Sequence, residues 1–261
     1  METKTASTKV DVYSRITNKI IADLEKGIRT WMKPWNADHA AGKITRPLRY
    51  NGLPYKGINI LSLWSASIDK GYACPLWLTF KQALTLGGNV RKGEKGELIV
   101  FANRITLKET NGRDEEEVER NISYMKAYKV FNAEQCDNLP AHYYAKAASF
   151  TLTPLQRIET ADWTKHDKRL SRHFGRLVHG DEGYAKEELV AELGAAFLCA
   201  DLSITPEVMP DHAAYIASWL TALKNDKRLI FSAASYAQRA VDYLHGEQPV
   251  YYTNYVTGID T

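Results

Sequence analysis

Two strand-like runs joined by a tight-turn signal occupy the middle of the chain, and segments with helical spacing of apolar residues lie on either side. The runs are LIVFANRITL at 98–107 and YMKAYKVF at 124–131, and Asn111-Gly112 between them favours a hairpin turn. Helical spacing is found at 11–26, 59–70, 80–86, 184–201, 211–224 and 226–245. The pattern predicts an α+β fold, with a small antiparallel sheet packed by helices in the N-terminal half and a mainly helical C-terminal half.

Periodicity is lost between the two halves, at residues 132–152, and we interpret this stretch as a linker. The predicted domains are therefore residues 1–131 and residues 153–261. A chain of 261 residues is long enough for one or two domains with a real hydrophobic core.

Several classes of protein are disfavoured by what the sequence lacks. The N-terminal segment has no apolar signal core and no long apolar run occurs anywhere, so no membrane partner is expected. Three widely spaced cysteines fit neither a disulfide framework nor a zinc pattern, which favours a reducing compartment, the cytoplasm. No Walker-type phosphate loop and no G-x-S-x-G elbow are present in the sequence.

Charge is distributed unevenly along the chain, although the formal net charge is only +3. Residues 1–108 hold 18 Lys and Arg against 8 Asp and Glu, a balance of +10. Residues 109–261 hold 16 against 23, a balance of −7. A strongly basic N-terminal half indicates a polyanionic partner.

The basic half is also rich in aromatic residues between positions 31 and 96. Cations that follow a phosphate backbone, beside rings on which bases stack, are what non-specific single-strand binding requires. The candidate stacking residues are Trp31, Trp35, Tyr50, Tyr55 and Trp77. The candidate phosphate contacts are Lys33, Arg46, Arg49, Lys56, Lys81, Arg91, Lys92 and Lys95. The alternative is that these rings belong to the core and the cations to a solvated face.

A carboxylate in an apolar setting is the most informative residue of the C-terminal half. Glu192 lies among alanine and leucine in the helix predicted at 184–201, where an unpaired charge is costly. It either faces solvent or pairs with a cation or a metal. A zinc peptidase carries the motif H-E-x-x-H, and none of the seven histidines has another four positions away. The residues alone therefore give no support to catalysis.

Several long strings, in order along the chain, resemble those of the ArdC-type antirestriction proteins of conjugative plasmids. They are KPWN at 33–36, NGLPYKGIN at 51–59, WLTFKQA at 77–83, GGNVRKGEKG at 87–96, WTKHDKRLSR at 163–172, YAKEELVAELGAAFLCADL at 184–202 and YIASWLTALKNDKRLIFSAAS at 215–235. The resemblance implies an N-terminal domain that binds single-stranded DNA, shared with some plasmid primases, and a C-terminal metallopeptidase-like domain. The implied role is protection of incoming DNA from the recipient's restriction enzymes during conjugation, with single-stranded DNA and a protein of the host restriction system as partners.

The chain departs from the family pattern at one junction. In the family, the string RIETAD precedes a segment of several dozen residues that ends in H-E-x-x-H, whereas here residues 157–162 join directly to residues 163–166. The resemblance places the carboxylate ligand of the peptidase metal at Glu192, and His166 lies just beyond the missing motif. A divalent metal, zinc or manganese, is expected if the motif segment belongs to the full protein, and none if the domain is internally shortened near 162/163.

Two other functions stay open beside single-strand binding. One is a zinc-type metallopeptidase acting on a DNA-associated protein, in which Glu192 is a ligand and the metal activates water. The other is a decoy that contacts a restriction enzyme through the acidic C-terminal half, although −7 is a low charge for a mimic of DNA. Whether the chain is an enzyme therefore depends on the missing motif.

Overall fold

The computed structural model describes residues 11–32, 45–110, 117–144, 182–202 and 212–246. The helices are α1 (Val12–Glu25), α2 (Ile58–Lys70), α3 (Phe80–Thr85), α5 (Glu182–Asp201), α6 (His212–Asn225) and α7 (Leu229–Gly246). The strands are β1 (Leu48–Arg49), β2 (Leu76–Leu78), β3 (Asn89–Val90), β4 (Glu97–Thr110), β5 (Glu117–Asn132) and β6 (Cys136–Asp137), with 3-10 turns η1 (Ala133–Gln135) and η2 (Ala141–Tyr144). The predicted α+β class is confirmed. None of the helices in these ranges has the length and apolar character of a membrane span.

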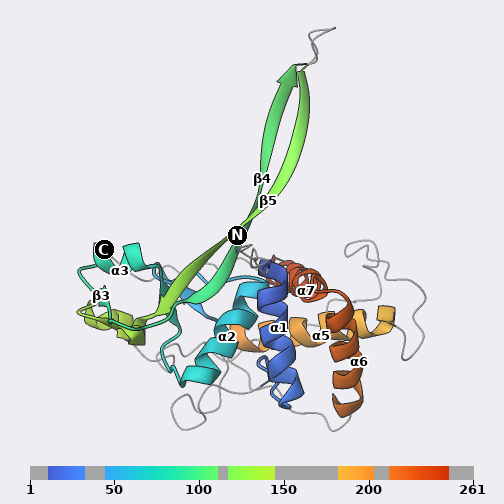
Figure 1. Cartoon of the computed structure of the whole chain (residues 1–261), viewed down its shortest axis with the longest axis horizontal. Coiled ribbons are helices and arrows are strands. Elements are labelled where there is room, and N and C mark those ends of the chain that lie inside the picture. The colour runs from blue at the N-terminus through green and yellow to red at the C-terminus, as the bar shows by residue number, and fades with distance from the viewer. Residues whose placement is uncertain (1–10, 33–44, 111–116, 145–181, 203–211, 247–261) are drawn as a thin grey trace, which may run out of the picture.

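A long antiparallel hairpin dominates the sheet and projects away from the helices (Figure 1). β4 and β5 are in register from Glu97 opposite Val130 to Thr110 opposite Glu117, which confirms the two predicted strands. The turn predicted at Asn111-Gly112 lies outside the described residues. At its base the hairpin joins a four-stranded sheet of order β1-β2-β5-β4, in which β1 and β2 are parallel and the other pairs antiparallel.

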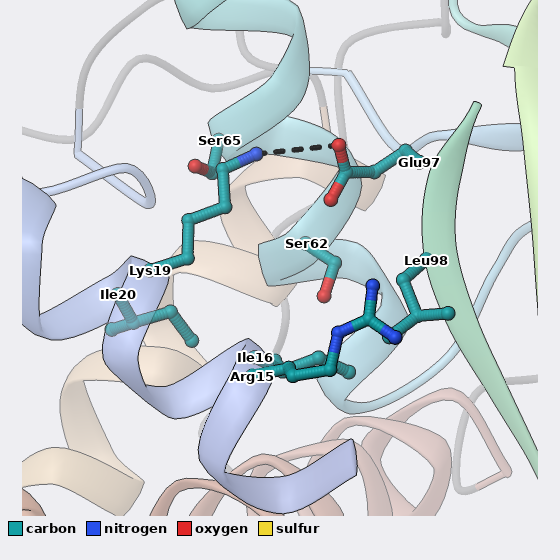
Figure 2. Close-up of a pocket in the computed structure, with 8 residues that line it drawn as sticks. All are labelled: Arg15, Ile16, Lys19, Ile20, Ser62, Ser65, Glu97 and Leu98. Atoms are coloured by element: carbon teal, nitrogen blue, oxygen red, sulfur yellow. Dashed lines mark ion pairs between the residues drawn. The ribbon is translucent and has the colours of Figure 1, made fainter. Parts of the chain in front are cut away.

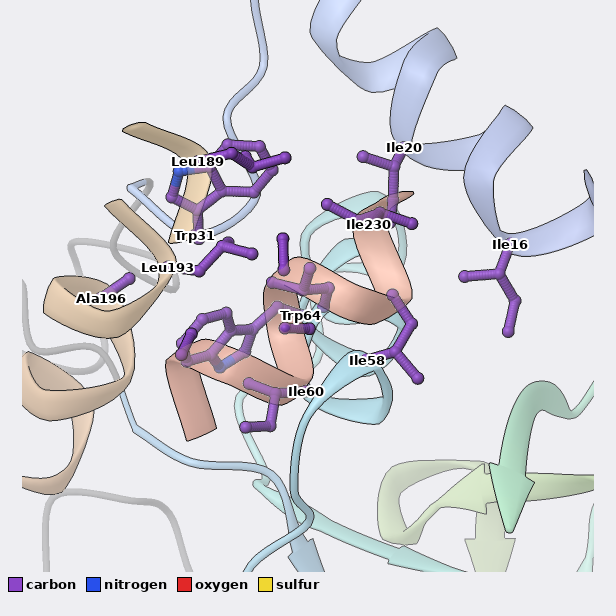
Figure 3. Packing of buried hydrophobic residues seen from close by; sticks show 14 of the residues in the cluster. Ile16, Ile20, Trp31, Ile58, Ile60, Trp64, Leu189, Leu193, Ala196 and Ile230 are labelled. Carbon is purple, nitrogen blue, oxygen red and sulfur yellow. The ribbon is translucent and has the colours of Figure 1, made fainter. Parts of the chain in front are cut away.

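One hydrophobic core is shared by helices from both ends of the chain (Figure 3). It includes Ile16 and Ile20 from α1, Ile58, Ile60 and Trp64 from α2, Leu189, Leu193 and Ala196 from α5, and Ile230 from α7. α1 and α2 precede the hairpin, whereas α5, α6 and α7 follow it, so the two halves cover each other's apolar helix faces. Removal of this apolar area from water is the main favourable contribution to folding.

A smaller core lies beneath α3 and the segment that follows β5. Cys74, Leu78 and Leu139 are buried in it, and β6 pairs with β3 beside it. Gly88 is required there, because a Cβ at this position would lie 2.6 Å from the Leu139 side chain. Residues 133–144, which we expected to be linker, therefore pack as part of the N-terminal half. The rest of the expected linker lies outside the described residues, and the division into two domains stays a prediction.

Candidate nucleic-acid interface

Three of the predicted stacking residues belong to the core. Trp31, Tyr55 and Trp77 expose 0%, 5% and 1% of their surface. Trp31 packs against Trp219 of α6 with ring centroids 6.0 Å apart, and Trp77 meets Tyr72 edge-on at 5.8 Å. A base cannot stack on a ring whose faces are covered by protein. For these three residues the core interpretation, and not the stacking interpretation, is correct.

Arg46, a predicted phosphate contact, is instead a buried link between the two halves. Its guanidinium contacts both carboxylate oxygens of Asp201, at 2.7 and 2.8 Å, and donates to the Gln238 side chain at 2.9 Å. Its guanidinium carbon lies 5.0 Å from the centroid of the Phe197 ring. These partners lie on α5 and α7, and Arg46 is 7% exposed, so it is not available to a phosphate.

Four other predicted phosphate contacts are exposed. They are Arg49, Lys81, Lys92 and Lys95. Tyr50, a predicted stacking residue, exposes 39% of its surface. A phosphate backbone can reach these side chains without any change in the fold.

The remaining predicted contacts are either paired or not described. Lys56 is exposed but pairs with Asp242 of α7 at 3.0 Å. The guanidinium of Arg91 pairs with Glu94 at 2.9 Å, and this hydrogen bond raises the Arg91 pKa. A phosphate would have to compete with these carboxylates. Lys33 and Trp35 lie outside the described residues.

An aromatic and cationic surface that we did not predict lies at the base of the hairpin. We call it the hairpin-base surface, and it is formed by Arg49, Phe101, Lys126 and Tyr128. Phe101 exposes 47% of its surface and Tyr128 exposes 39%. Phe101 lies directly opposite Lys126 in the β4–β5 register, and Tyr128 is two residues from Lys126 along β5. The three side chains therefore share one face of the ribbon.

Arg49 joins this face through Tyr55. The Arg49 guanidinium carbon lies 5.5 Å from the centroid of the Tyr55 ring. Burial raises the pKa of Tyr55, and the charge of Tyr128 raises it further. The buried Tyr55 ring thus supports the exposed cation of Arg49. The signal for this surface was the alternation of rings and lysines in YMKAYKVF, which we interpreted as strand structure alone.

A second exposed ring lies on α3, on the other side of the sheet. Phe80 exposes 52% of its surface, and Lys81 beside it is also exposed. The Phe80 ring contacts Phe131 of β5 with centroids 6.5 Å apart. Because Phe131 and Tyr128 are three residues apart, they point to opposite faces of the strand. We therefore treat Phe80 and Lys81 separately from the hairpin-base surface.

Polar contacts hold the base of the hairpin against the helices. α1, α2 and the first residues of β4 surround a hollow of about 200 Å³, across which Lys19 pairs with Glu97 at 3.4 Å (Figure 2). The side-chain amide of Asn59 in α2 bonds both the N–H and the carbonyl of Val100, each at 2.8 Å. These contacts satisfy the backbone hydrogen-bonding groups of Val100 at the outer edge of β4. They thereby fix the orientation of the hairpin-base surface.

The metal site implied by the resemblance is not assembled among the residues that the structure describes. Glu192 Oε1 lies 3.6 Å from Nη1 of Arg29, and both side chains are largely buried. Of the alternatives left open for Glu192, pairing with a cation is therefore the observed one. In the part of the chain that the structure describes, no group of three or more His, Cys, Asp or Glu could hold a metal ion. His166 lies outside that part, and the sequence contains no H-E-x-x-H.

The buried thiols also lack the properties of a nucleophile. Burial raises the pKa of Cys74 and of Cys136 to about 11. Very little thiolate is therefore present at neutral pH, and the thiolate is the reactive form. These cysteines act as small core residues.

Two crystal structures of the antirestriction protein ArdC from plasmid R388, one metal-free and one bound to Mn(II), resemble this chain. Their TM-scores are 0.70 and 0.69 and their identities 36% and 35%. The match to the metal-free structure covers 90% of this chain and 97% of that one. The chain belongs to the ArdC antirestriction family. In agreement, the family model "N-terminal domain of anti-restriction factor ArdC" matches residues 10–131, and "Zincin-like metallopeptidase" matches residues 115–236.

Relatives of this ArdC family member differ from it in length. Uncharacterized protein y4eC of Sinorhizobium fredii is 34% identical over 308 residues, covering 98% of this chain and 98% of y4eC. Since 98% of 261 residues is about 256, about fifty positions of that alignment have no residue of this chain. Such a difference in length is what we expect if this chain is internally shortened. DNA primase TraC of Escherichia coli is 30% identical over 298 residues, covering 92% of this chain but 27% of the primase.

The metal site gives a direct prediction for this ArdC chain. We expect Mn²⁺, Zn²⁺ or a chelator to leave its thermal unfolding midpoint unchanged, because Arg29 pairs with the Glu192 carboxylate and the sequence contains no H-E-x-x-H. A metal bound to the folded state alone at about 100 times its Kd would add about 2.7 kcal/mol, which thermal unfolding detects easily. A saturable rise in the midpoint, together with stoichiometric metal in plasma emission, would contradict the prediction. The variant Glu192→Gln would then show whether this residue is a ligand.

Proposed function

We propose that the chain binds single-stranded DNA without sequence preference, with the hairpin-base surface as its main contact, and so protects incoming plasmid DNA from restriction during conjugation. The observation that carries the proposal is the position of Arg49, Phe101, Lys126 and Tyr128 at one exposed base of the hairpin. Membership of the ArdC antirestriction family supports the protective role. The match to a DNA primase supports a nucleic-acid partner.

The chemistry of this surface suits a single strand better than a duplex. Phe101 and Tyr128 offer ring faces to bases, which a duplex keeps stacked on one another. Arg49 and Lys126 offer donors and positive charge to the phosphates on either side. Every base has a ring face, so stacking of this kind tolerates any sequence. Such tolerance is what protection of an arbitrary plasmid requires.

The proposal predicts that exposed rings carry the affinity. In the full chain, Tyr128→Leu or Phe101→Ala should each weaken binding to a labelled single-stranded oligonucleotide by about fivefold to a hundredfold, because a stacked base contributes roughly 1–3 kcal/mol. Tyr128→Phe keeps the ring and should bind like the parent. Fluorescence anisotropy at two salt concentrations measures the effect. Equal affinities for the Leu and Phe variants would show that the hairpin-base surface is not the stacking platform.

The same variants test the biological role. Plasmid transfer into a restricting recipient, relative to a non-restricting one, should rise when the parent chain is supplied and should not rise with the Tyr128→Leu, Phe101→Ala double variant. If the double variant binds no DNA but still protects the plasmid, protection would instead depend on a protein contact with the host restriction system. No peptide hydrolysis is part of the proposal, because the sequence lacks the histidines and glutamate of the motif.

A further inference from the structure

A second aromatic and cationic surface lies in the C-terminal half, on the outer side of α7. We call it the α7 surface. Tyr13 from the first turn of α1 meets Arg228, Phe231, Ser235, Tyr236 and Arg239 there, around a hollow of about 350 Å³. The opposite side of α7 is buried in the core, so these residues form its solvent side. Neither the hairpin nor any predicted site residue contributes to this hollow.

The rings and guanidinium groups of this surface are arranged in pairs. The guanidinium carbon of Arg228 lies 5.0 Å from the centroid of the Tyr13 ring, and that of Arg239 lies 5.5 Å from the Tyr236 ring. Phe231 meets Tyr13 edge-on at 4.6 Å. Stacking on a ring orders the guanidinium plane but leaves its N–H donors at the edge. Each pair therefore presents an oriented set of donors beside a ring.

Neither Arg228 nor Arg239 is neutralised by an ion pair within the described ranges, although Asp11, whose pKa is lowered by hydrogen bonds from Ser14 and further by Arg228, lies nearby. Arg46 and Arg91 pair with carboxylates, whereas neither Arg228 nor Arg239 forms an ion pair with any carboxylate in the described part of the chain. Both are exposed. Guanidinium groups of this kind are the usual partners of phosphate, which they bind through two donors at once.

The spacing of the two arginines fits a strand better than a single phosphate. Arg228 immediately precedes α7 and Arg239 lies eleven residues further along the chain, which corresponds to roughly 16 Å at 1.5 Å per residue. The rings of Tyr13, Phe231 and Tyr236 lie between or beside them. A few nucleotides could span this distance, with phosphates at the two arginines and bases against the rings. An acidic peptide would use the cations but not the ring faces.

α1 connects this surface to the base of the hairpin. Arg15 and Lys19 of α1 line the hollow beside Glu97 and Leu98 of β4 (Figure 2), whereas Tyr13 lines the hollow of α7. A strand that leaves the hairpin-base surface would therefore meet the first turn of α1 and then α7. We propose that the α7 surface binds the continuation of the same single-stranded DNA. This inference rests on the proposed function and assigns to the peptidase-like half a part in DNA binding.

The test compares a short and a long oligonucleotide on the full chain. The double variant Arg228→Gln, Arg239→Gln should bind a poly-dT strand of about 30 nucleotides at least tenfold more weakly than the parent at low salt, and one of about 10 nucleotides equally well. Loss of two phosphate contacts should also reduce the slope of log K against log salt for the long strand by about 1.4. The control is Lys26→Gln, Lys224→Gln, which removes the same charge at the C-terminal ends of α1 and α6, from residues that do not line the hollow of α7, and should leave both strands unaffected.

The outcomes separate the two proposals. If Tyr128→Leu weakens binding but the arginine double variant behaves like the lysine control, the strand does not reach α7 and this inference fails alone. If the parent chain binds neither strand, the proposed function fails as well. If poly-glutamate displaces the long strand from the parent as well as unlabelled poly-dT does, the surface recognises charge without bases, and the assignment to DNA is overturned.

Discussion

Replacing Arg46 with methionine is expected to lower the free energy of unfolding by about 3–5 kcal/mol. The methionine keeps the length of the side chain but leaves the carboxylate of Asp201 without its bidentate partner, in a position that is largely buried. Gln238 loses a donor at the same time. His245 of α7 also contacts Asp201, at 2.9 Å, but it is a single contact and does not replace the two that the guanidinium makes. The lost contacts lie where the segment beside β1 meets α5 and α7. The substitution should therefore destabilise both halves of the chain together.

Urea unfolding followed by circular dichroism measures this effect. Arg49→Met is the matched control, because Arg49 is close to Arg46 in the sequence but is exposed. Its replacement should change the free energy of unfolding by no more than about 0.5 kcal/mol. The double variant Arg46→Met, Asp201→Asn removes both charges and should be less destabilised than the two single changes added together. A loss below about 1 kcal/mol for Arg46→Met would mean that water replaces the guanidinium, and Arg46 would return to the list of candidate phosphate contacts.

Trp31→Ala is expected to have an effect of similar size, about 3–5 kcal/mol, through a cavity rather than a charge. The Trp31 ring is fully buried and packs on Trp219 of α6. The single-strand affinity of the folded fraction should be unchanged. Phe101→Ala is the complementary variant, because Phe101 is exposed and should lose affinity while keeping stability. A Trp31→Ala chain that unfolds like the parent but binds DNA weakly would restore the stacking role and contradict the burial observed here.

The local elements of the fold were predictable because their signals are local. The alternation and turn dipeptide of the hairpin, the apolar spacing of α1 and α2 and the hydroxyl cap of α3 are read within a few residues. In that cap the Thr79 hydroxyl accepts from the N–H of Gln82 at 3.2 Å, and the Gln82 side chain accepts from the N–H of Thr79 at 2.8 Å. The family was also predictable, because its strings lie along most of the chain.

The candidate site was predictable only in part, because burial depends on distant partners. Arg46 finds Asp201 at a separation of 155 residues, and Trp31 finds its cover on α6. Nothing beside Trp31 in the sequence distinguishes it from an exposed ring such as Phe101. The basic composition favoured the N-terminal half as the binding region, but three of the five predicted stacking residues and one predicted phosphate contact, Arg46, have structural roles. The two exposed rings of the hairpin-base surface, Phe101 and Tyr128, lie on strands, and the alternating pattern there already had a structural explanation.

The shared core changes how the two halves should be studied. The N-terminal family model ends at residue 131, yet α1 and α2 pack against α5, α6 and α7. A fragment of residues 1–131 would expose Ile20 and Trp64, which are 1% and 0% exposed in the whole chain. Binding experiments should therefore use the full chain. If a fragment failed to bind DNA, the result would show that it does not fold, and would not test the DNA-binding surface.

The hairpin gives the family a part whose length is independent of the core. Fourteen registered pairs span roughly 45 Å at about 3.4 Å per residue, and the outer pairs lie beyond the sheet formed with β2. Deletion of two residues from each strand would shorten the ribbon and keep every remaining side chain on its face, whereas deletion of one from each would turn the outer pairs over. The distance between the tip and the body can therefore change during evolution in steps of two residues, as a spacer does, without any repacking of the helices.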